Sequence, residues 1–227
     1  MPFSDLQFFP LALPFFLILF FLIAILIGLI EIGILEYAYE KIGINRRYIF
    51  ILLLLSLIGS YVNIPIVELP ARRIVSDQVV TYFGMQYIIP RVYHWQRTVI
   101  AANLGGAIIP ALLSVYLLLK NRIYGRGLIG SAIVAFIVHS MAEPVPGVGI
   151  AIPVFIPPLV AAGTALLLSQ RFAPPLAYIS GSMGTLIGAD LLNLGRIQEL
   201  GAPVASIGGA GTFDGIFVTG ILAVVLA

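Results

Sequence analysis

Apolar residues in this chain gather into long segments, and polar residues fall mainly between them. The segments lie at residues 8–38, 48–68, 98–119, 127–143, 150–170, 174–194 and 204–227. A helix needs ~20 mostly apolar residues to cross a bilayer, and most of these segments are close to that length or exceed it. The pattern therefore predicts an all-α, polytopic membrane protein of about seven transmembrane helices, with residues 1–227 forming a single transmembrane domain.

The segment 69–97 departs from this pattern. It places charged residues, such as Arg72, Asp77 and Arg91, among β-branched and aromatic residues on either side of Gly84. This mixture predicts a small β-hairpin or an amphipathic lid on the outer membrane surface. An ordinary interfacial loop with an aromatic belt is the alternative interpretation.

The composition supports a membrane protein. Hydrophobic residues make up 60% of the 227 positions, charged residues make up 10%, and the mean hydropathy is +1.10. Soluble domains carry about 25% charged residues, so the composition favours a cell-membrane protein whose main partner is the lipid bilayer. The chain has no cysteine, which excludes disulfides, thiolate metal sites and a cysteine nucleophile. A formal net charge of +2 without a long basic run argues against nucleic acid as a partner.

The basic residues of the loops are divided unevenly between the two predicted sides of the membrane. One side collects Lys41, Arg46, Arg47, Lys120, Arg122, Arg126 and Arg171. The other side has Arg72, Arg73, Arg91, Arg97 and Arg196, mostly within the long segment 69–97. Because basic residues are enriched in short cytoplasmic loops, the distribution predicts an outside N-terminus and a cytoplasmic C-terminus.

Two aspartates stand inside apolar segments, where a charged side chain costs about 2.5–3.5 kcal/mol on insertion scales. Asp214 lies in a glycine-rich stretch and is followed by an almost wholly apolar run, whereas Asp190 follows Gly188 and Ala189. Carboxylates in such places need a partner or a wet cavity. Both aspartates are therefore predicted to be functional.

Other polar residues accompany the two aspartates. His139 and Glu143 are spaced i, i+4 and are predicted to share a helix face. Asn63 and Asn103 are expected to hydrogen-bond between helices. Asn193 lies about one helical turn after Asp190. In the predicted topology these groups lie in the outer half of the membrane, which indicates one polar site. Their structural alternatives are head-group contacts and hydrogen bonds between helices.

Glycines recur at short spacings in the last two apolar segments. They are Gly181, Gly184 and Gly188, followed by Gly208, Gly211, Gly215 and Gly220. Small residues let two helices approach closely in lipid, so these segments are predicted to pack together and to bring Asp190 towards Asp214. Two carboxylates that share a low-dielectric site split their titrations, which suits acid–base hydrolysis and a proton-coupled carrier equally.

Three classes of function fit this site. The first is an intramembrane hydrolase of the aspartyl-protease type, which would cleave a transmembrane peptide with Asp190 and Asp214. The second is a transporter or channel for a small cation or for protons, using also His139 and Glu143. The third is a metal-dependent membrane enzyme in which the same four residues would hold a divalent metal, although the chain has no HExxH motif. No cofactor is expected for the first two classes, and each is compatible with an oligomer.

Motifs spread over most of the chain carry a first resemblance. They are Asn63-Ile64-Pro65, Pro144-Val145-Pro146-Gly147-Val148-Gly149-Ile150, Ile187-Gly188-Ala189-Asp190 and Ser206-Ile207-Gly208-Gly209-Ala210-Gly211-Thr212-Phe213-Asp214-Gly215. In these motifs the chain resembles an uncharacterised family of prokaryotic, largely archaeal, multipass membrane proteins. The resemblance implies a multipass membrane protein and brings no known activity.

A second, local likeness is to the presenilin-type intramembrane aspartyl proteases. That family carries Tyr-Asp on one helix and Gly-x-Gly-Asp on the next, and here Phe213-Asp214 resembles the first motif and Gly188-Ala189-Asp190 the second. The likeness implies that Asp190 and Asp214 are catalytic. The chain departs from the family in the Phe, in Ala189 and in the reversed order of the motifs. The Pro110-Ala111-Leu112 sequence also precedes both aspartates, whereas the family has its Pro-Ala-Leu motif after them.

Overall fold

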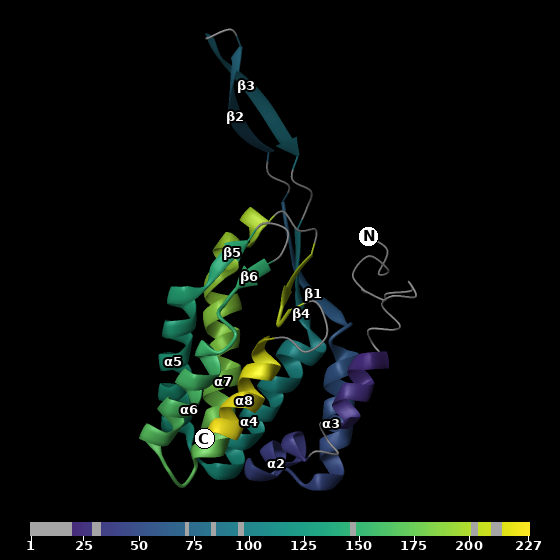
Figure 1. Cartoon of the computed structure of the whole chain (residues 1–227), viewed down its shortest axis with the longest axis vertical. Helices are drawn as coiled ribbons and strands as arrows, with labels where there is room; N and C mark the ends of the chain where they lie inside the picture. Colours follow the sequence, from purple (N-terminus) through teal and green to yellow (C-terminus); the bar gives the residue numbers. More distant parts are fainter. Residues whose placement is uncertain are drawn as a thin grey trace.

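A computed structural model describes residues 20–28, 33–70, 73–82, 85–94, 98–145, 149–200, 204–209 and 215–227. The helices pack side by side, and the short strands gather at one end of them (Figure 1). The helices are α2 (Ile34–Lys41), α3 (Arg46–Gly59), α4 (Ile109–Asn121), α5 (Tyr124–Met141), α6 (Ile156–Leu168), α7 (Ala173–Thr185) and α8 (Gly215–Leu226). Residues 20–28 are also helical.

Irregular helical segments extend α4 and α7 at the end of the molecule that carries the strands. The π-helical turn η2 (Leu104–Ile108) precedes α4, and the π-helical turn η3 (Leu186–Asp190) follows α7. The 3₁₀ segment η4 (Leu191–Leu200) then continues from η3. π-Turns inside helices occur frequently at functional sites, so both junctions mark candidate positions.

A three-stranded sheet corrects the expectation of an all-α fold. Its strands β1 (Asn63–Leu69), β4 (Thr98–Asn103) and β7 (Val204–Ile207) lie in the order β1-β4-β7, with β1 antiparallel and β7 parallel to β4. These strands lie at the ends of apolar segments that were expected to be helical throughout. Short apolar runs rich in Val and Ile cannot be distinguished from helix ends by periodicity alone, which is why the sequence pattern missed the sheet.

Two hairpins complete the strands. Strands β2 (Arg73–Tyr82) and β3 (Met85–His94) pair antiparallel, which confirms the hairpin predicted for 69–97. Its position on an outer membrane surface stays a prediction. Strands β5 (Glu143–Val145) and β6 (Gly149–Ala151) form the second, shorter pair.

The number of helices suited to crossing a membrane is smaller than expected. In the described part of the chain, the segments Leu104–Asn121 and Tyr124–Met141 are long and apolar enough. A third crossing is added if α2 and α3, which are bent by 110° relative to each other, count as one span. Helices α6 and α8 are apolar but shorter. About seven transmembrane helices, at ~20 residues each, are therefore not supported, because several predicted segments divide between a helix and a strand.

Helix α7 lies at the centre of the helical part, and nearly all of its side chains are buried. A Cβ atom at Gly220 of α8 would lie 2.4 Å from Ser182 Oγ of α7, so these two helices pack closely, as the glycine pattern predicted. The glycine spacing predicted the wrong neighbour for the other face of α7. Added Cβ atoms at Gly184 and Gly188 would lie 2.5 Å from Val134 Cβ and 2.4 Å from Ala135 O, which places these glycines against α5.

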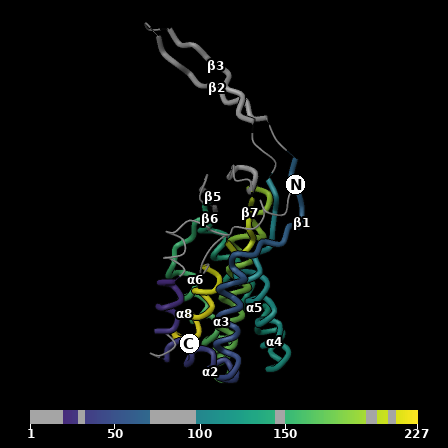
Figure 2. The backbone as a smooth tube through the Cα atoms, turned by 90° about the vertical axis from the view of Figure 1, so that its right-hand side faces the viewer, coloured from purple at the N-terminus to yellow at the C-terminus, as the bar shows by residue number. Residues whose placement is uncertain are grey.

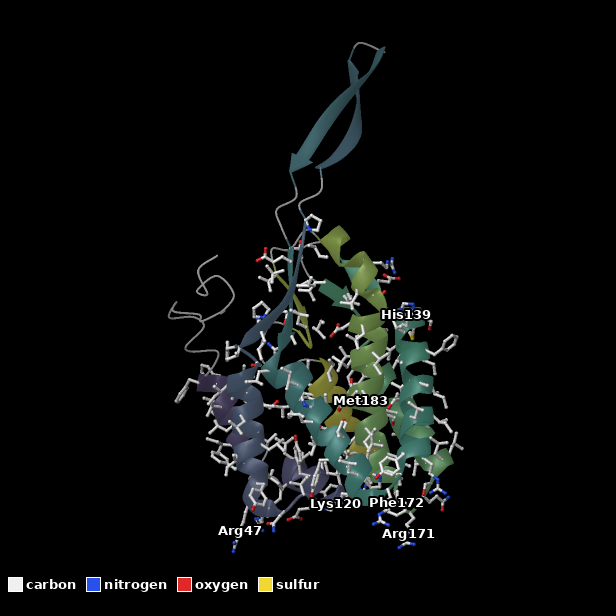
Figure 3. All side chains as sticks on the ribbon, turned by 180° about the vertical axis from the view of Figure 1, so that it is seen from behind. Arg47, Lys120, His139, Arg171, Phe172 and Met183 are labelled. Carbon is white, nitrogen blue, oxygen red and sulfur yellow. The ribbon has the colours of Figure 1, made fainter. Side chains whose placement is uncertain are left out.

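Basic side chains occupy the end of the helices opposite to the sheet. Arg47, Lys120 and Arg171 lie at this end, whereas His139 lies towards the other end of α5 (Figure 3). The C-terminus lies at the same end as α2 (Figure 2), where Lys41 Nζ donates a hydrogen bond of 3.4 Å to the carbonyl oxygen of Val224. The molecule therefore has a basic end and a sheet end, and we use these names below.

Candidate active site at the sheet end of α7

Two asparagines pair across the β1–β4 ladder at the sheet end. Asn63 and Asn103 are register partners, and Asn103 is fully buried. The Asn103 amide donates to the carbonyl oxygen of Ser60 at 2.6 Å and to Asn63 Oδ1 at 3.1 Å, and its own Oδ1 accepts from the Gly106 N–H at 2.8 Å. Asn103 therefore fixes where α3 ends and β1 begins, and where η2 begins. Both asparagines lie on strands, which corrects the expectation that they belong to the second and third helices.

Ser206 joins this pair to the turn that ends β7. Its Oγ lies 2.6 Å from Asn63 Oδ1 and 2.5 Å from the carbonyl oxygen of Gly209, and its single proton can serve one of these acceptors at a time. The turn requires glycine, because Gly208 and Gly209 have φ angles of +83° and +77°. A Cβ atom at Gly208 would also lie 2.5 Å from the Ala107 nitrogen of η2. The turn is thus pressed directly onto the first π-turn.

Asp190 contacts the same turn. It is the last residue of η3 and is half-buried, and the Gly208 N–H donates a hydrogen bond of 2.7 Å to its Oδ2. A backbone donor holds one carboxylate oxygen in a fixed direction. The carboxylate is therefore held between the turn after β7 and the second π-turn.

A cavity of about 280 Å³ lies beside Asp190. Its walls come from β6 and the residues after it, from the end of α7 with η3, and from the start of α8. The lining residues are Ile150, Ala151, Ile152, Val154, Thr185, Ala189, Asp190, Gly215, Ile216, Val218 and Thr219. The walls are mainly aliphatic, with polar groups contributed by Asp190, Thr185 and Thr219. Such a cavity lowers the local dielectric and strengthens any interaction that the carboxylate makes.

Asp214 lies outside the described residues, so its expected approach to Asp190 stays a prediction. Gly215, the residue that follows Asp214 in the sequence, lines the cavity together with Asp190.

Asn193 supports the end of η3. It is buried, and its amide nitrogen lies 3.1 Å from the Gly188 carbonyl oxygen and 2.9 Å from that of Ala189. The same nitrogen lies 3.2 Å from Nδ1 of His139 on α5. These contacts satisfy carbonyl groups where the π-turn changes to a 3₁₀ helix, and they orient the amide so that its nitrogen faces the two carbonyl oxygens. Asn193 thus has the supporting position that was expected for it.

His139 and Glu143 do not share a helix face, which corrects the expected i, i+4 pair. Helix α5 ends at Met141, because Ala142 takes an extended conformation and Glu143 begins β5. Pro144 disfavours a helical conformation for the residue before it, which accounts for the early end of the helix. Both side chains are exposed.

Three of the four residues proposed for a metal, His139, Glu143 and Asp190, lie in the described part of the chain. No group of three or more His, Asp or Glu side chains there could hold a metal ion. Because Asp214 lies outside that part, the full set of four remains a hypothesis.

Two residues of the site were not found from the sequence. Ser206 lies on a short strand that the apolar pattern hid, and the motif that begins with it carried a family resemblance without indicating a role for the hydroxyl. Thr185 lies five residues before Asp190, and both line the cavity. Their shared position follows from the π-turn between them, because five residues correspond to one π-helical hydrogen-bond step. The sequence pattern did not predict that π-turn.

Fold and site together define a helical protein with two or three described helices apolar enough to span a membrane, and with a small sheet that holds Asp190 beside a cavity. Residues 57–226 match the family described as "Protein of unknown function (DUF1614)", and the chain belongs to that family. The match confirms the resemblance to an uncharacterised family, and its range includes every candidate site residue. No curated protein and no solved structure matches the chain.

Proposed function

We propose that this chain is an integral membrane hydrolase that cleaves a transmembrane peptide with Asp190 and Asp214 as its acid–base pair. One observation carries the proposal: Asp190 and Gly215, the neighbour of Asp214 in the sequence, line the same largely aliphatic cavity. A carboxylate in such surroundings has the environment in which aspartate pairs divide one proton between them.

The chemistry assigns one role to each carboxylate. The ionised aspartate takes a proton from water, and the oxygen of that water forms a bond to the carbonyl carbon of the peptide. The protonated aspartate first donates to the carbonyl oxygen, and a proton then passes to the leaving nitrogen as the C–N bond breaks. The products are one carboxylic acid and one amine, and the pair returns to its starting state.

A membrane location is part of the proposal. Large apolar side chains are exposed on α4, α5 and α6, as at Leu112, Phe136 and Leu167, which are 64%, 74% and 91% exposed. Apolar exposure on this scale is what lipid contact explains. With the basic end on the cytoplasmic side, the sheet end and Asp190 lie towards the outside, and the C-terminus is cytoplasmic.

The distance between the two aspartates can be tested first, by disulfide formation. The chain has no native cysteine, so Asp190→Cys combined with Asp214→Cys has no competing thiol. A disulfide needs Cα atoms about 4.4–6.8 Å apart, so efficient oxidation supports the pair. Ile64→Cys with Ala102→Cys, which are register partners on β1 and β4, is the positive control, and Asp190→Cys with Leu226→Cys is the negative control. Failure of the aspartate pair alone removes the dyad.

Activity can be tested in proteoliposomes with a set of fluorescent transmembrane peptides. Wild type is expected to cleave at least one peptide, whereas Asp190→Asn and Asp214→Asn are each expected to be inactive. A peptide with a hydroxyethylene group at the cleaved bond resembles the tetrahedral state and should bind wild type more tightly than either variant. Cleavage that survives both substitutions would refute the proposal.

A carrier for a cation or for protons is the second candidate. The observation that favours it is the change from α-helix to π-turn and then to 3₁₀ helix at Asp190. Discontinuous helices beside a carboxylate are typical of ion sites in transporters. Ion uptake measured in the same proteoliposomes decides between the two, since uptake that needs Asp190 without any peptide cleavage favours the carrier.

A further inference from the structure

A second cavity lies at the basic end, between α3 and α4 and away from Asp190. It has a volume of about 600 Å³. Its lining residues are Gly43, Ile44, Asn45, Tyr48, Ile51, Leu52, Leu55, Ile109, Leu112, Leu113, Tyr116 and Lys120. Several of these side chains are exposed, including Ile51 at 52% and Leu55 at 56%, so the cavity is an open groove along the two helices. Below we call it the α3–α4 groove.

The groove is apolar along its length and polar at one end. Lys120 stands at the polar end, where its Nζ donates to the carbonyl oxygen of Gly43 and lies 5.5 Å from the centre of the Tyr116 ring. An ammonium group has three N–H donors, so Lys120 can hold this loop and still donate to a ligand. Tyr48 and Asn45 line the same part of the groove and add further donors.

The first turn of α3 makes this end strongly positive. It contains Arg46 and Arg47 and no acidic residue, although a helix N-terminus already carries a partial positive charge. Arg46 forms an ion pair with Glu36, whereas Arg47 is exposed at the basic end (Figure 3). Glu36 therefore compensates Arg46, whereas the exposed Arg47 beside the positive end of the helix dipole is unfavourable unless another anion lies near it.

We propose that the α3–α4 groove binds an anionic membrane lipid, with its phosphate at Lys120 and the start of α3 and one acyl chain along the apolar walls. The proposal rests on insertion of the chain into a membrane and does not depend on hydrolysis at Asp190. The charge at the polar end selects the occupant. A second copy of the chain docked through this face would bring two basic ends together, and a zwitterionic lipid would leave the positive field uncompensated.

A tryptophan in the groove can report which lipid occupies it. The chain has one tryptophan, at position 95, so Trp95→Phe gives a background in which Tyr116→Trp is the sole reporter. Vesicles of phosphatidylcholine with a minor fraction of acyl-brominated phosphatidylglycerol are compared with vesicles in which brominated phosphatidylcholine is the minor lipid. Quenching by the brominated anionic lipid is expected to exceed that by brominated phosphatidylcholine about fivefold, the enrichment that one basic side chain supplies. Phe136→Trp on the exposed face of α5 is the matched reporter, and there both lipids are expected to quench equally.

Charge variants identify the head-group contacts. Lys120→Gln, at a residue that lines the groove, and Arg47→Gln, between the lining residues Asn45 and Tyr48, are each expected to lower the preference for the anionic lipid. Arg171→Gln, at the same end but beside the start of α7, is expected to keep it. Because Lys120 also holds the loop at Gly43, Arg47→Gln and a series of salt concentrations test the same charge without changing that contact. Equal quenching by the two lipids at Tyr116→Trp, or a preference unchanged by both Arg47→Gln and salt, would overturn the proposal.

Discussion

The backbone N–H of Gly208 donates a 2.7 Å hydrogen bond to Oδ2 of Asp190, and this bond connects the end of β7 with the end of η3. Gly208 is itself pressed against Ala107 of η2. The carboxylate is therefore positioned by a turn that a third element, distant in sequence, holds in place. The variants below test how the sheet end is held together and whether its chemistry can be separated from its stability.

Gly208→Ala is expected to lower the free energy of unfolding by about 2–4 kcal/mol. The loss has two causes, because alanine disfavours the left-handed backbone and its Cβ atom would be forced against Ala107. Thermal unfolding in detergent micelles measures the loss. Two control substitutions separate the causes. Gly33→Ala has a φ of +79° but no atom of the described residues within 4 Å of the new Cβ, so it should show the backbone cost alone. Gly163→Ala lies in α6, where the part of the chain that the structure describes leaves open space around the new Cβ, and it should cost nothing. A Gly208→Ala variant as stable as Gly163→Ala would contradict the close contact.

Asp190→Asn is expected to separate chemistry from stability. The amide oxygen of asparagine can accept the same hydrogen bond from Gly208, so the unfolding free energy should change by less than about 1 kcal/mol. Peptide cleavage should fall at least about 100-fold, because the amide cannot act as an acid or base. Asp190→Ala loses both the acid–base group and the acceptor for Gly208, so it should be inactive and should also destabilise the protein by about 1–3 kcal/mol. If Asp190→Asn destabilises as much as Asp190→Ala, the carboxylate has a mainly structural role.

Asn103→Leu is expected to destabilise the sheet end by about 3 kcal/mol or more. The substitution leaves the Ser60 carbonyl and the Gly106 N–H without this buried partner, and each unsatisfied group costs about 1–3 kcal/mol. Asn63 Oδ1 also loses one donor but keeps Ser206. Asn121→Ala is the matched control, because the Asn121 amide makes one half-buried hydrogen bond to the Leu117 carbonyl oxygen. Chemical denaturation of both variants measures the difference. Equal losses would mean that the Asn103 network contributes little.

Periodicity and length predicted the helices that have one environment along their whole length. The expected helix at 127–143 is observed as Tyr124–Met141, and the hairpin in 69–97 is observed as two paired strands. Segments that contain both a strand and a helix, such as 98–119, were predicted only in part. Both halves of such a segment are apolar, and the strand pairs with residues far away in sequence, which local patterns do not contain.

The sequence predicted which polar residues lie at the site more accurately than it predicted their hydrogen-bond partners. Asn63, Asn103, Asn193 and Asp190 gather at the sheet end through hydrogen bonds, and a cost argument for buried polar groups was enough to select them. Their bonding partners are mainly backbone groups of turns and π-segments. Those partners depend on backbone geometry that side-chain identity does not determine, which is why the role of Gly208 was missed.

Thr185→Val is expected to leave the protein equally stable or to stabilise it by about 1 kcal/mol. Thr185 is 1% exposed, and its Oγ1 has no hydrogen-bond partner within the ranges that the structure describes. Replacing an unpaired buried hydroxyl with a methyl group removes a desolvation cost while nearly preserving shape. Because Thr185 lines the cavity with Asp190, the same change should weaken binding of the hydroxyethylene peptide by about 5–10-fold, the value of about one hydrogen bond. Thr164→Val, a buried threonine of α6 outside the cavity, should leave peptide binding unchanged. A Thr185→Val variant that loses stability and binds the peptide normally would show that the hydroxyl serves the fold, and the cavity would then have Asp190 as its main polar contact for substrate.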